Sequence, residues 1–523
     1  MLHKNRHSDR LVFLFLILLL GMACSTVQAI PATQSGGTPT PPFSAGQVGS
    51  AVAMTLTGSA PEVEQPTASP PPVTPTSSSA SFAPGDPTAT PLGSEITDPN
   101  FIEGLADYQA ENYDQVVALM SAVIASNPHL APPYRYRATS YWYLGDCPSG
   151  LSDADQALSI NPEYAEAWAA RGLLHACLGD ELQSWQDYQK ALSIDPSLAF
   201  IHHNLAVHYY EAGDFQKALE EYSLAVAIDP NRAAAWSGKA EALGQMGRYV
   251  ECIENATKAI EIDPQEWLAY SDRAFCSLAI ESYAATAADY KIYLDHHLDD
   301  SSAWYNYGIS QRHTDDLQGA VESYTRALEL DPSYYPAHIN RGNAYRDLEQ
   351  YDKALNDYNA ALEFGDIPLA YSGRGDAYYG LGKYEQAIAD YKTSLSLFPD
   401  NAHCYCFLTF SYFELERYEE ALEAAEATHE IDPSCGGQRL LEIQARSYYG
   451  LENYDWALEY IDKALDMGQF SLGYYYRGLI LQAMGRNAEA IQDLERFLAT
   501  IRSRDEWAKE IADAEARLRT LKP

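Results

Sequence analysis

The chain has 523 residues with 73 acidic and 35 basic side chains, which gives a net charge of −38 at pH 7. Only five of the acids and three of the bases lie in the first 96 residues, so the remainder keeps 68 acids, 32 bases and a net charge of −36. Such a surface argues against nucleic acid as a partner, because the phosphate backbone needs a basic face. The simplest interpretation of the charge is solubility of a large exposed surface.

The N-terminus has the features of a targeting segment. Basic residues precede an apolar run over residues 11–20, which is short for a membrane span and typical of a signal-peptide core. Two endings compete. Residues 21–24 resemble a bacterial lipobox that would make Cys24 a site of lipid attachment, whereas residues 27–29 form an ordinary signal-peptidase site. We therefore predict a signal peptide over 1–23 and export to the cell envelope, either lipid-anchored through Cys24 on the outer face of a membrane or freely secreted.

Residues 24–96 are predicted to form a disordered stalk. From residue 25 to residue 96 there is no Lys or Arg, and Pro, Thr, Ser, Ala and Gly dominate. A segment of this composition cannot bury a core and favours extended conformations.

After residue 96 the chain repeats itself. Prolines recur at a step of 34 residues, with one gap of twice 34 and one of 67, at Pro128, Pro162, Pro196, Pro230, Pro264, Pro332, Pro399 and Pro433. Each proline ends an amphipathic segment, because the residue before a proline avoids helical dihedral angles. A constant period of this length indicates an array of helix–turn–helix units.

Small residues keep the same period. One set lies in the first helix of each unit, at Ala138, Gly172, Ala206, Ala240, Ala274, Gly308, Gly342 and Gly375. A second set opens the second helix twelve residues later, from Gly150 to Ala387, with further members at Ala421, Ala457 and Ala490. An aromatic residue often follows four residues after the second set, at Tyr188, Tyr222, Tyr290, Tyr324, Tyr358 and Tyr391. Paired small residues would let the two helices approach closely.

This pattern resembles the tetratricopeptide repeat family, of the bacterial secreted or lipoprotein type. The resemblance implies an all-α solenoid of about twelve repeats over residues 97–503, wound as a right-handed superhelix. Residues 504–523 are predicted to form one last helix that caps the array, because Trp507, Ile511, Ala514, Leu518 and Leu521 make an apolar stripe. The family pattern says little about the ligand, since one fold hosts many functions.

One internal correlation predicts a contact. Six repeats have Arg one residue before the small site of the first helix and Asp sixteen residues later: Arg137 and Asp153, Arg171 and Asp187, Arg273 and Asp289, Arg341 and Asp357, Arg374 and Asp390, Arg477 and Asp493. Repeats that lack this Arg carry other residues at the second site, for example Glu221. Residues that vary together are expected to touch, so we predict an Arg–Asp pair between the two helices of each of these repeats.

The array holds seven cysteines, and secretion would permit disulfides between neighbouring repeats. Candidate pairs are Cys147 with Cys177, Cys252 with Cys276, and Cys404 or Cys406 with Cys435. The alternative, left open by the sequence, is that they are small core residues.

No sequence motif for catalysis, phosphate binding or metal binding is present, so we predict no enzyme activity, no catalytic residue, no metal and no cofactor.

The resemblance implies that first helices line a concave groove. The residues expected to contact a ligand there are mostly aromatic, with one polar group of Arg and Asn: Trp142, Tyr210, Phe275, Tyr305, Arg312, Asn340, Asn343, Arg346, Tyr379, Phe410, Phe413 and Tyr449. Arg312 and Arg346 could bind a carboxylate of the ligand in bidentate fashion. Alternatively, Asp347 and Asp376 neutralise them.

Taken together, the sequence predicts an extracytoplasmic scaffold that binds peptide or protein segments in its groove, with no nucleic acid partner. The alternative is a structural assembly factor for cell-envelope machinery, in polysaccharide export or wall synthesis, acting through its convex or terminal surfaces. An enzyme is a third possibility without support.

Overall fold

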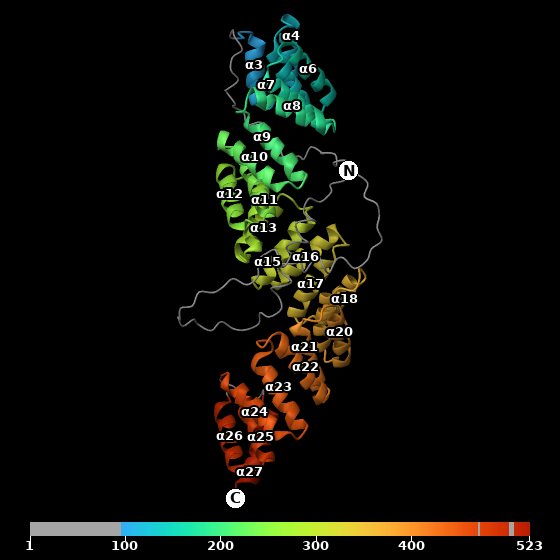
Figure 1. The fold of residues 1–523 in the computed structure, drawn as a ribbon, viewed down its shortest axis with the longest axis vertical. Coiled ribbons are helices and arrows are strands. Elements are labelled where there is room, and N and C mark those ends of the chain that lie inside the picture. The colour runs from blue at the N-terminus through green and yellow to red at the C-terminus, as the bar shows by residue number, and fades with distance from the viewer. Residues whose placement is uncertain (1–95, 469–470, 502–506, 523) are drawn as a thin grey trace. The chain divides into compact units, whose positions relative to one another are not determined.

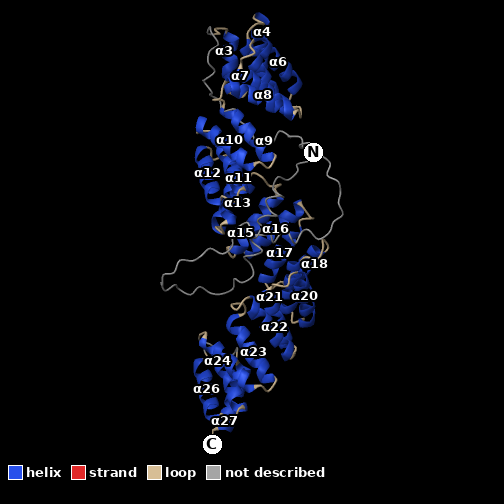
Figure 2. Ribbon diagram, viewed as in Figure 1, coloured by secondary structure: helices blue, strands red, loops and turns tan. Residues whose placement is uncertain are grey.

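The computed structural model describes residues 96–468, 471–501 and 507–522. The predicted signal peptide over 1–23, Cys24 and the stalk up to residue 95 lie outside the described residues. The described part is built from helices and turns and contains no strand (Figure 2). It divides into two compact units, here called the N-terminal unit (residues 96–272) and the C-terminal unit (residues 273–522).

Consecutive antiparallel helix pairs make up the N-terminal unit, coloured blue to green in Figure 1. Its helices are α3 (Pro99–Gln109), α4 (Tyr113–Ser126), α5 (Ala131–Tyr143), α6 (Cys147–Ile160), α7 (Ala165–Cys177), α8 (Glu181–Ile194), α9 (Ala199–Glu211), α10 (Phe215–Ile228), α11 (Ala233–Gln245) and α12 (Tyr249–Ile262). The division between the units falls within α13 (Trp267–Ala279).

The C-terminal unit continues the pairs and ends on a single helix. Its further helices are α14 (Tyr283–Leu294), α15 (Ser301–His313), α16 (Leu317–Leu330), α17 (Tyr335–Asp347), α18 (Tyr351–Leu362), α19 (Pro368–Gly380), α20 (Tyr384–Leu397), α21 (Ala402–Glu414), α22 (Tyr418–Ile431), α23 (Gly437–Gly450), α24 (Tyr454–Asp466), α25 (Ser471–Ala483), α26 (Asn487–Thr500) and α27 (Ala508–Leu521). Over the described residues this gives twelve pairs and a closing helix, so the predicted all-α repeat fold is confirmed.

Within each unit, packing is repetitive. The two helices of a pair contact each other, the second helix contacts the first helix of the next pair, and first helices also contact one another, as α17 and α19 or α21 and α23 do. Each repeat therefore buries its apolar surface mainly against its neighbours.

The turn between the helices of a pair needs a left-handed residue. Gly382 has φ of 70° there, and Glu416 takes the same position in the next repeat with φ of 57°. The equivalent residues in the other described pairs also have positive φ: Glu111, Gly145, Gly179, Gly213, Gly247, Glu281, Asp315, Glu349, Glu452 and Gly485. The acidic members strain the backbone, because an L residue tolerates this region poorly.

The predicted small sites hold the helices close. A Cβ added to Gly375 would lie 2.6 Å from the ring of Tyr391, and one added to Gly342 would lie 3.0 Å from the ring of Tyr358. Both tyrosines are fully buried. The absence of a side chain at the small site thus leaves room for the tyrosine ring of the second helix.

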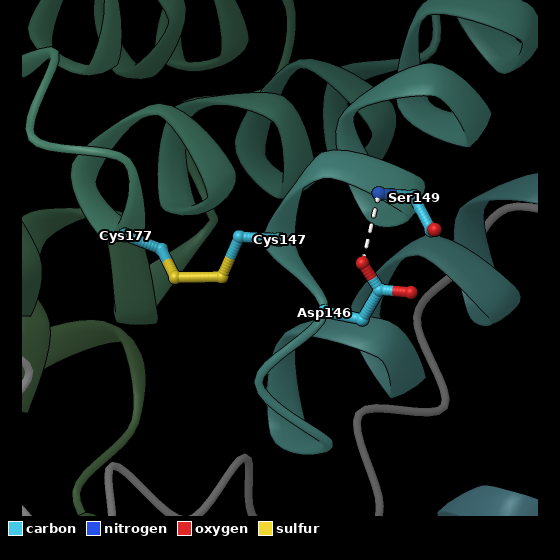
Figure 3. Close-up of a disulfide and its surroundings, with 4 residues drawn as sticks. All are labelled: Asp146, Cys147, Ser149 and Cys177. Carbon is cyan, nitrogen blue, oxygen red and sulfur yellow. Dashed lines mark hydrogen bonds between the residues drawn. A yellow bond between two sulfur atoms is a disulfide. The ribbon is translucent and has the colours of Figure 1, made fainter.

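The disulfide between Cys147 and Cys177 is confirmed (Figure 3). It joins the start of α6 to the end of α7, with the two Cα atoms 6.3 Å apart. Beside it, the Asp146 carboxylate caps α6 by accepting a hydrogen bond from the backbone N–H of Ser149 at 3.3 Å (Figure 3).

The remaining array cysteines differ from one another. Cys252 and Cys276 are each disulfide-bonded. Cys404, Cys406 and Cys435 are not, so the predicted bridge to Cys435 is wrong. Cys406 and Cys435 are instead buried in one apolar cluster, where a thiol packs as a small hydrophobic group.

Helix α27 closes the array with the predicted stripe. Ile511 and Ala514 are buried against the last repeat, and Trp507, Leu518 and Leu521 pack around them. The residues of the last repeat that they pack against are Tyr475 on α25 and Leu494 and Phe497 on α26. This helix covers the apolar edge that the last repeat would otherwise expose.

Candidate functional site

All six predicted Arg–Asp pairs are present as bidentate ion pairs. In the pair of α17 and α18, Arg341 Nε and Nη2 donate to the two Asp357 oxygens at 2.8 and 2.7 Å. The other five pairs have the same geometry, with donor–acceptor distances of 2.6–2.8 Å. The Asp side chains are at least nine-tenths buried. These arginines are therefore structural and are not available to a polyanion.

The structure adds a partner that the sequence analysis missed. The third nitrogen, Nη1, reaches the second helix of the preceding repeat, where Arg341 donates to Thr325 at 3.0 Å and Arg477 to Asp462 at 2.7 Å. One arginine thus links three helices. The partner residue varies among Ser, Thr, Asn and Asp, so no single residue type revealed it in the sequence.

A repeat without the arginine uses a different pair at the same place. Glu221 stands at the Asp site of the fourth repeat, and the ring of His202 lies 2.7 Å from its carboxylate. The histidine comes from the first helix, α9, so the link between the two helices of the repeat is kept.

The interpretation of Arg312 and Arg346 as unpartnered carboxylate binders is wrong. Arg312 donates to Asp347 at 2.6 Å, and Arg346 donates to Asp376 at 2.7 Å and to Asp347 at 3.1 Å. The alternative, neutralisation by Asp347 and Asp376, is confirmed. The reason is the repeat geometry. Asp347 lies on α17 together with Arg346 and one first helix after Arg312, and Asp376 lies on the following first helix, α19, so each carboxylate reaches an arginine of a neighbouring first helix.

These charges belong to a longer polar network along α15, α17, α19 and α21. Asp376 also faces His403 at 3.0 Å and accepts a hydrogen bond from the hydroxyl of Tyr391 at 2.9 Å. Burial opposes the negative charge on Asp376, but His403, Arg346 and Tyr391 outweigh it and hold the pKa of its carboxyl below the usual value.

The two predicted asparagines satisfy buried tyrosines of the same network. Asn340 donates to the hydroxyl of Tyr305 at 2.8 Å, and the hydroxyl of Tyr358 donates to Asn343 at 2.7 Å. Tyr305 is only 1% exposed. This part of the predicted site is thus internal structure: Asn340 links the successive first helices α15 and α17, and Asn343 links α17 to the second helix α18 of its own repeat.

The other predicted site residues fall into two groups. Phe275 and Phe410 are buried, which favours packing between repeats. Partly exposed are Trp142, Tyr210, Tyr379, Phe413 and Tyr449. Of these, Trp142 packs beside the Cys147–Cys177 disulfide, whereas Tyr379 and Phe413 lie in the cluster described next.

Tyr379, Phe410, Phe413, Arg439, Arg446 and Tyr476 form a continuous row across α19, α21, α23 and α25, here called the aromatic–arginine row. Its contacts run from helix to helix. Arg439 lies over the ring of Phe410 at 4.6 Å and donates to the Tyr379 hydroxyl at 2.9 Å. Arg446 lies between the rings of Phe413 and Tyr476, 4.5 and 4.4 Å from their centroids.

Charge in the row is only partly compensated. Arg446 donates to Glu442 at 2.9 Å, and burial raises the pKa of that carboxyl while the arginine opposes the shift. Arg439, which is exposed, has no acidic partner within ion-pair distance among the described residues. The sequence analysis missed Arg439 and Tyr476. The available signal was position, since Arg439 precedes Arg446 by seven residues and so shares its helix face.

Two further properties concern the described ranges as a whole. None of their helices is both long enough and apolar enough to cross a bilayer. Within the same ranges, His, Cys, Asp and Glu residues do not gather in groups of three suited to a metal ion.

Consecutive helix pairs that each contact the next pair define a helical repeat protein of the solenoid class. Profiles of the tetratricopeptide repeat match residues 137–199, 199–232, 233–266, 301–334, 335–364 and 368–401. The chain therefore contains tetratricopeptide repeats over residues 137–266, 301–364 and 368–401.

Similarity to individual proteins is local or distant. DnaJ homolog subfamily C member 7 is 43% identical in Homo sapiens and 40% in Mus musculus, in each case over 42 residues. That stretch is 8% of this chain and 8% of the length of each of these relatives.

Several solved structures are similar to this chain at low identity. The Cut9–Hcn1 hetero-tetramer of APC/C is 14% identical with a TM-score of 0.39, over 83% of this chain and 97% of that one. A tetratricopeptide repeat protein of Parabacteroides merdae is 21% identical with a TM-score of 0.36, over 50% and 100%. YrrB, a repeat protein with an unusual peptide-binding site, is 21% identical with a TM-score of 0.33, over 35% and 95%.

Proposed function

We propose that the protein is a non-catalytic interaction scaffold that binds extended peptide segments of partner proteins along its first helices, with the aromatic–arginine row as a principal contact. The observation that carries the proposal is the state of Arg439. Arg439 is an exposed residue. Its guanidinium lies over the ring of Phe410 and donates to the hydroxyl of Tyr379, and no acid lies within ion-pair distance of it in the described part of a strongly acidic chain.

Residues of this kind suit peptide recognition. Aromatic and Arg side chains are enriched at the energetically important centres of protein interfaces. Here the stacking contacts already fix the side chains, so less conformational entropy is lost when a partner binds. Tyr379, Phe413 and Tyr476 keep part of their surface accessible, which offers apolar contact next to the guanidinium groups.

The test uses an array of immobilised 12-residue peptides of varied sequence, probed with the purified chain. Tyr379→Ala, Phe413→Ala and Arg439→Gln should each weaken binding to the peptides that the wild type retains. The expected loss in affinity is about 10- to 100-fold, the usual range for central interface residues. Trp456→Ala is a matched control, because Trp456 is an aromatic residue 47% exposed on a second helix of the same unit. Binding that survives all three row variants would contradict the proposal and favour assembly through other surfaces.

We also propose that the protein is exported, either to be anchored at the cell envelope through Cys24 or to be freely secreted. The basic and apolar N-terminal pattern supports this, and so does the Cys147–Cys177 disulfide, since disulfides persist in oxidising compartments. Expression with its own leader, followed by N-terminal sequencing, tests it. A mature chain that begins with a lipid-modified Cys24 supports the anchor, one that begins at Ile30 supports free secretion, and an intact N-terminus after fractionation to the cytoplasm contradicts export.

A further inference from the structure

The N-terminal unit contains an arginine with no ion pair to any residue that the structure describes. Arg135 lies on α5, seven residues before the predicted groove residue Trp142 and so on the same face of this helix. The neighbouring Arg137 on this helix is bound in its Arg–Asp pair, and Arg312 and Arg346 on first helices of the C-terminal unit are paired with aspartates. Arg135, like Arg439, lacks such a partner among the described residues.

Its guanidinium is held in place by aromatic contact. The central carbon lies 4.5 Å from the centroid of the Tyr136 ring. That ring is fixed in turn by edge contacts to Tyr108 at 5.3 Å and to Phe101 at 5.9 Å. The Nε atom of Arg135 is buried and has no hydrogen-bond partner among the described residues. The residue as a whole is only partly buried, so part of its surface is open to a ligand.

A second unsatisfied donor lies against the same ring. The hydroxyl of Tyr108, on α3, is buried and makes no hydrogen bond to any residue that the structure describes. Buried polar groups without a partner destabilise a fold unless a bound molecule satisfies them, so two such groups around one ring indicate a binding position. One acid, Glu166 on α7, is within electrostatic reach of Arg135 but forms no ion pair with it.

We propose that Arg135, Tyr136 and Tyr108 form a carboxylate-binding site that receives an acidic side chain of a peptide partner. The terminal edge of a guanidinium matches a carboxylate in bidentate geometry, the Tyr136 ring supports the guanidinium plane, and the Tyr108 hydroxyl is a further donor. A peptide carboxylate fits better than a phosphate dianion, because Arg137 is already bound to Asp153, Arg135 is the arginine of α5 without an ion pair among the described residues, and Glu166 adds negative charge nearby. This proposal rests on the proposed function and names one chemical class that the scaffold selects.

The experiment uses peptide arrays in three matched versions, which differ only in having Glu, Gln or phosphoserine at each tested position. The protein is tested as wild type, as Arg135→Gln, as Tyr108→Phe and as Glu166→Gln. Arg248→Gln is the matched control, because Arg248 forms only an exposed pair with Glu251, with side chains 41% and 50% accessible. Circular dichroism melts accompany every variant. Arg135→Lys is added in case Arg135→Gln does not fold.

For the wild type, Glu peptides should be retained about 10- to 100-fold better than their Gln counterparts, as expected for a charge-assisted hydrogen-bonded pair. Arg135→Gln should remove this preference with an unchanged melt, Arg135→Lys should restore only part of it, and Tyr108→Phe should reduce it. Glu166→Gln should strengthen binding, because it removes the competing carboxylate.

Three results would overturn the site. The first is a Glu preference unaffected by Arg135→Gln, while the aromatic–arginine row variants still lose binding, which refutes this site and leaves the proposed function intact. The second is a preference for phosphoserine. The third is a loss of stability in Glu166→Gln with no gain in binding, which would show that Arg135 serves to balance Glu166. Retention of no peptide at all would refute the proposed function together with this site.

Discussion

Removal of Arg341 tests the idea that the Arg–Asp pairs hold the repeats together. In Arg341→Ala, Asp357 loses two short charge-assisted hydrogen bonds and Thr325 loses a third. The Asp357 side chain is only 6% exposed, and His338 at 3.3 Å is its remaining partner among the described residues. A buried acid would therefore be left largely uncompensated.

The magnitude follows from this partial burial. Breaking a buried ion pair costs about 3–5 kcal/mol and breaking an exposed one about 0.2–1 kcal/mol. Because Arg341 keeps 18% of its side chain accessible, solvent screens part of the interaction. We expect Arg341→Ala to lower the local stability of its repeat by about 2–4 kcal/mol.

Native-state hydrogen exchange is the appropriate assay, because a repeat array need not unfold in one step. Amides of α17 and α18 should exchange about 30- to 700-fold faster in the variant, at tenfold per 1.4 kcal/mol. The control is Arg326→Ala, whose partner Glu329 and own side chain are 57% and 43% exposed, so the change should stay below about 1 kcal/mol.

The decisive comparison is the double variant Arg341→Ala with Asp357→Ala. Removing the acid as well should recover part of the loss, because no buried charge then remains without a partner. If the two single effects simply add, or if Arg341→Ala costs no more than Arg326→Ala, the pair does not stabilise the repeat and our reasoning fails.

Three further predictions concern stability. Replacing Cys147 and Cys177 by Ala should destabilise the N-terminal unit by about 3.5 kcal/mol, the loop-closure value for a separation of 30 residues, in urea unfolding without reductant; equal midpoints would contradict it. Glu416→Gly should stabilise its turn by about 0.5–1 kcal/mol, because it relieves a positive φ of 57°, and faster exchange of the flanking amides would count against this. Burial, with the charges of two nearby aspartates, raises the pKa of Glu266 to about 7. Since this folded value exceeds the ordinary 4.5, the folded state binds the proton more tightly and stability falls as pH rises from about 4.5 to 7. Glu266→Gln should therefore stabilise the protein by about 1–3 kcal/mol at pH 8 and hardly at pH 4, as measured by urea unfolding at both pH values, and an equal effect at the two pH values would refute the assignment.

Much of the architecture was predictable because the chain is periodic. Each repeat contacts mainly its neighbours, so a 34-residue pattern of small residues and prolines suffices to define the helix pairs. The Arg–Asp pairs were predictable for a related reason. Both partners lie within one repeat, sixteen residues apart, and therefore change together from repeat to repeat.

The candidate site was less predictable, because its residues meet across repeats. From the sequence, Arg312 and Arg346 could be either ligand-binding or neutralised, and the choice depended on whether Asp347 and Asp376 point toward them. Contacts between successive first helices bring these four side chains together, at separations of 30 and 35 residues that no local pattern marks.

The sequence by itself determined the helix pairs, the closing helix and the Arg–Asp pairs, since all of these depend on spacing within a repeat or on the apolar face of one helix. Only the tertiary structure decided which charges remain available. Arg135 has no ion pair among the described residues and Arg439 has no acidic partner there, whereas Arg312 and Arg346 are neutralised. The physical reason is that a bidentate pair depends on the direction of two side chains from neighbouring repeats, and packing sets that direction.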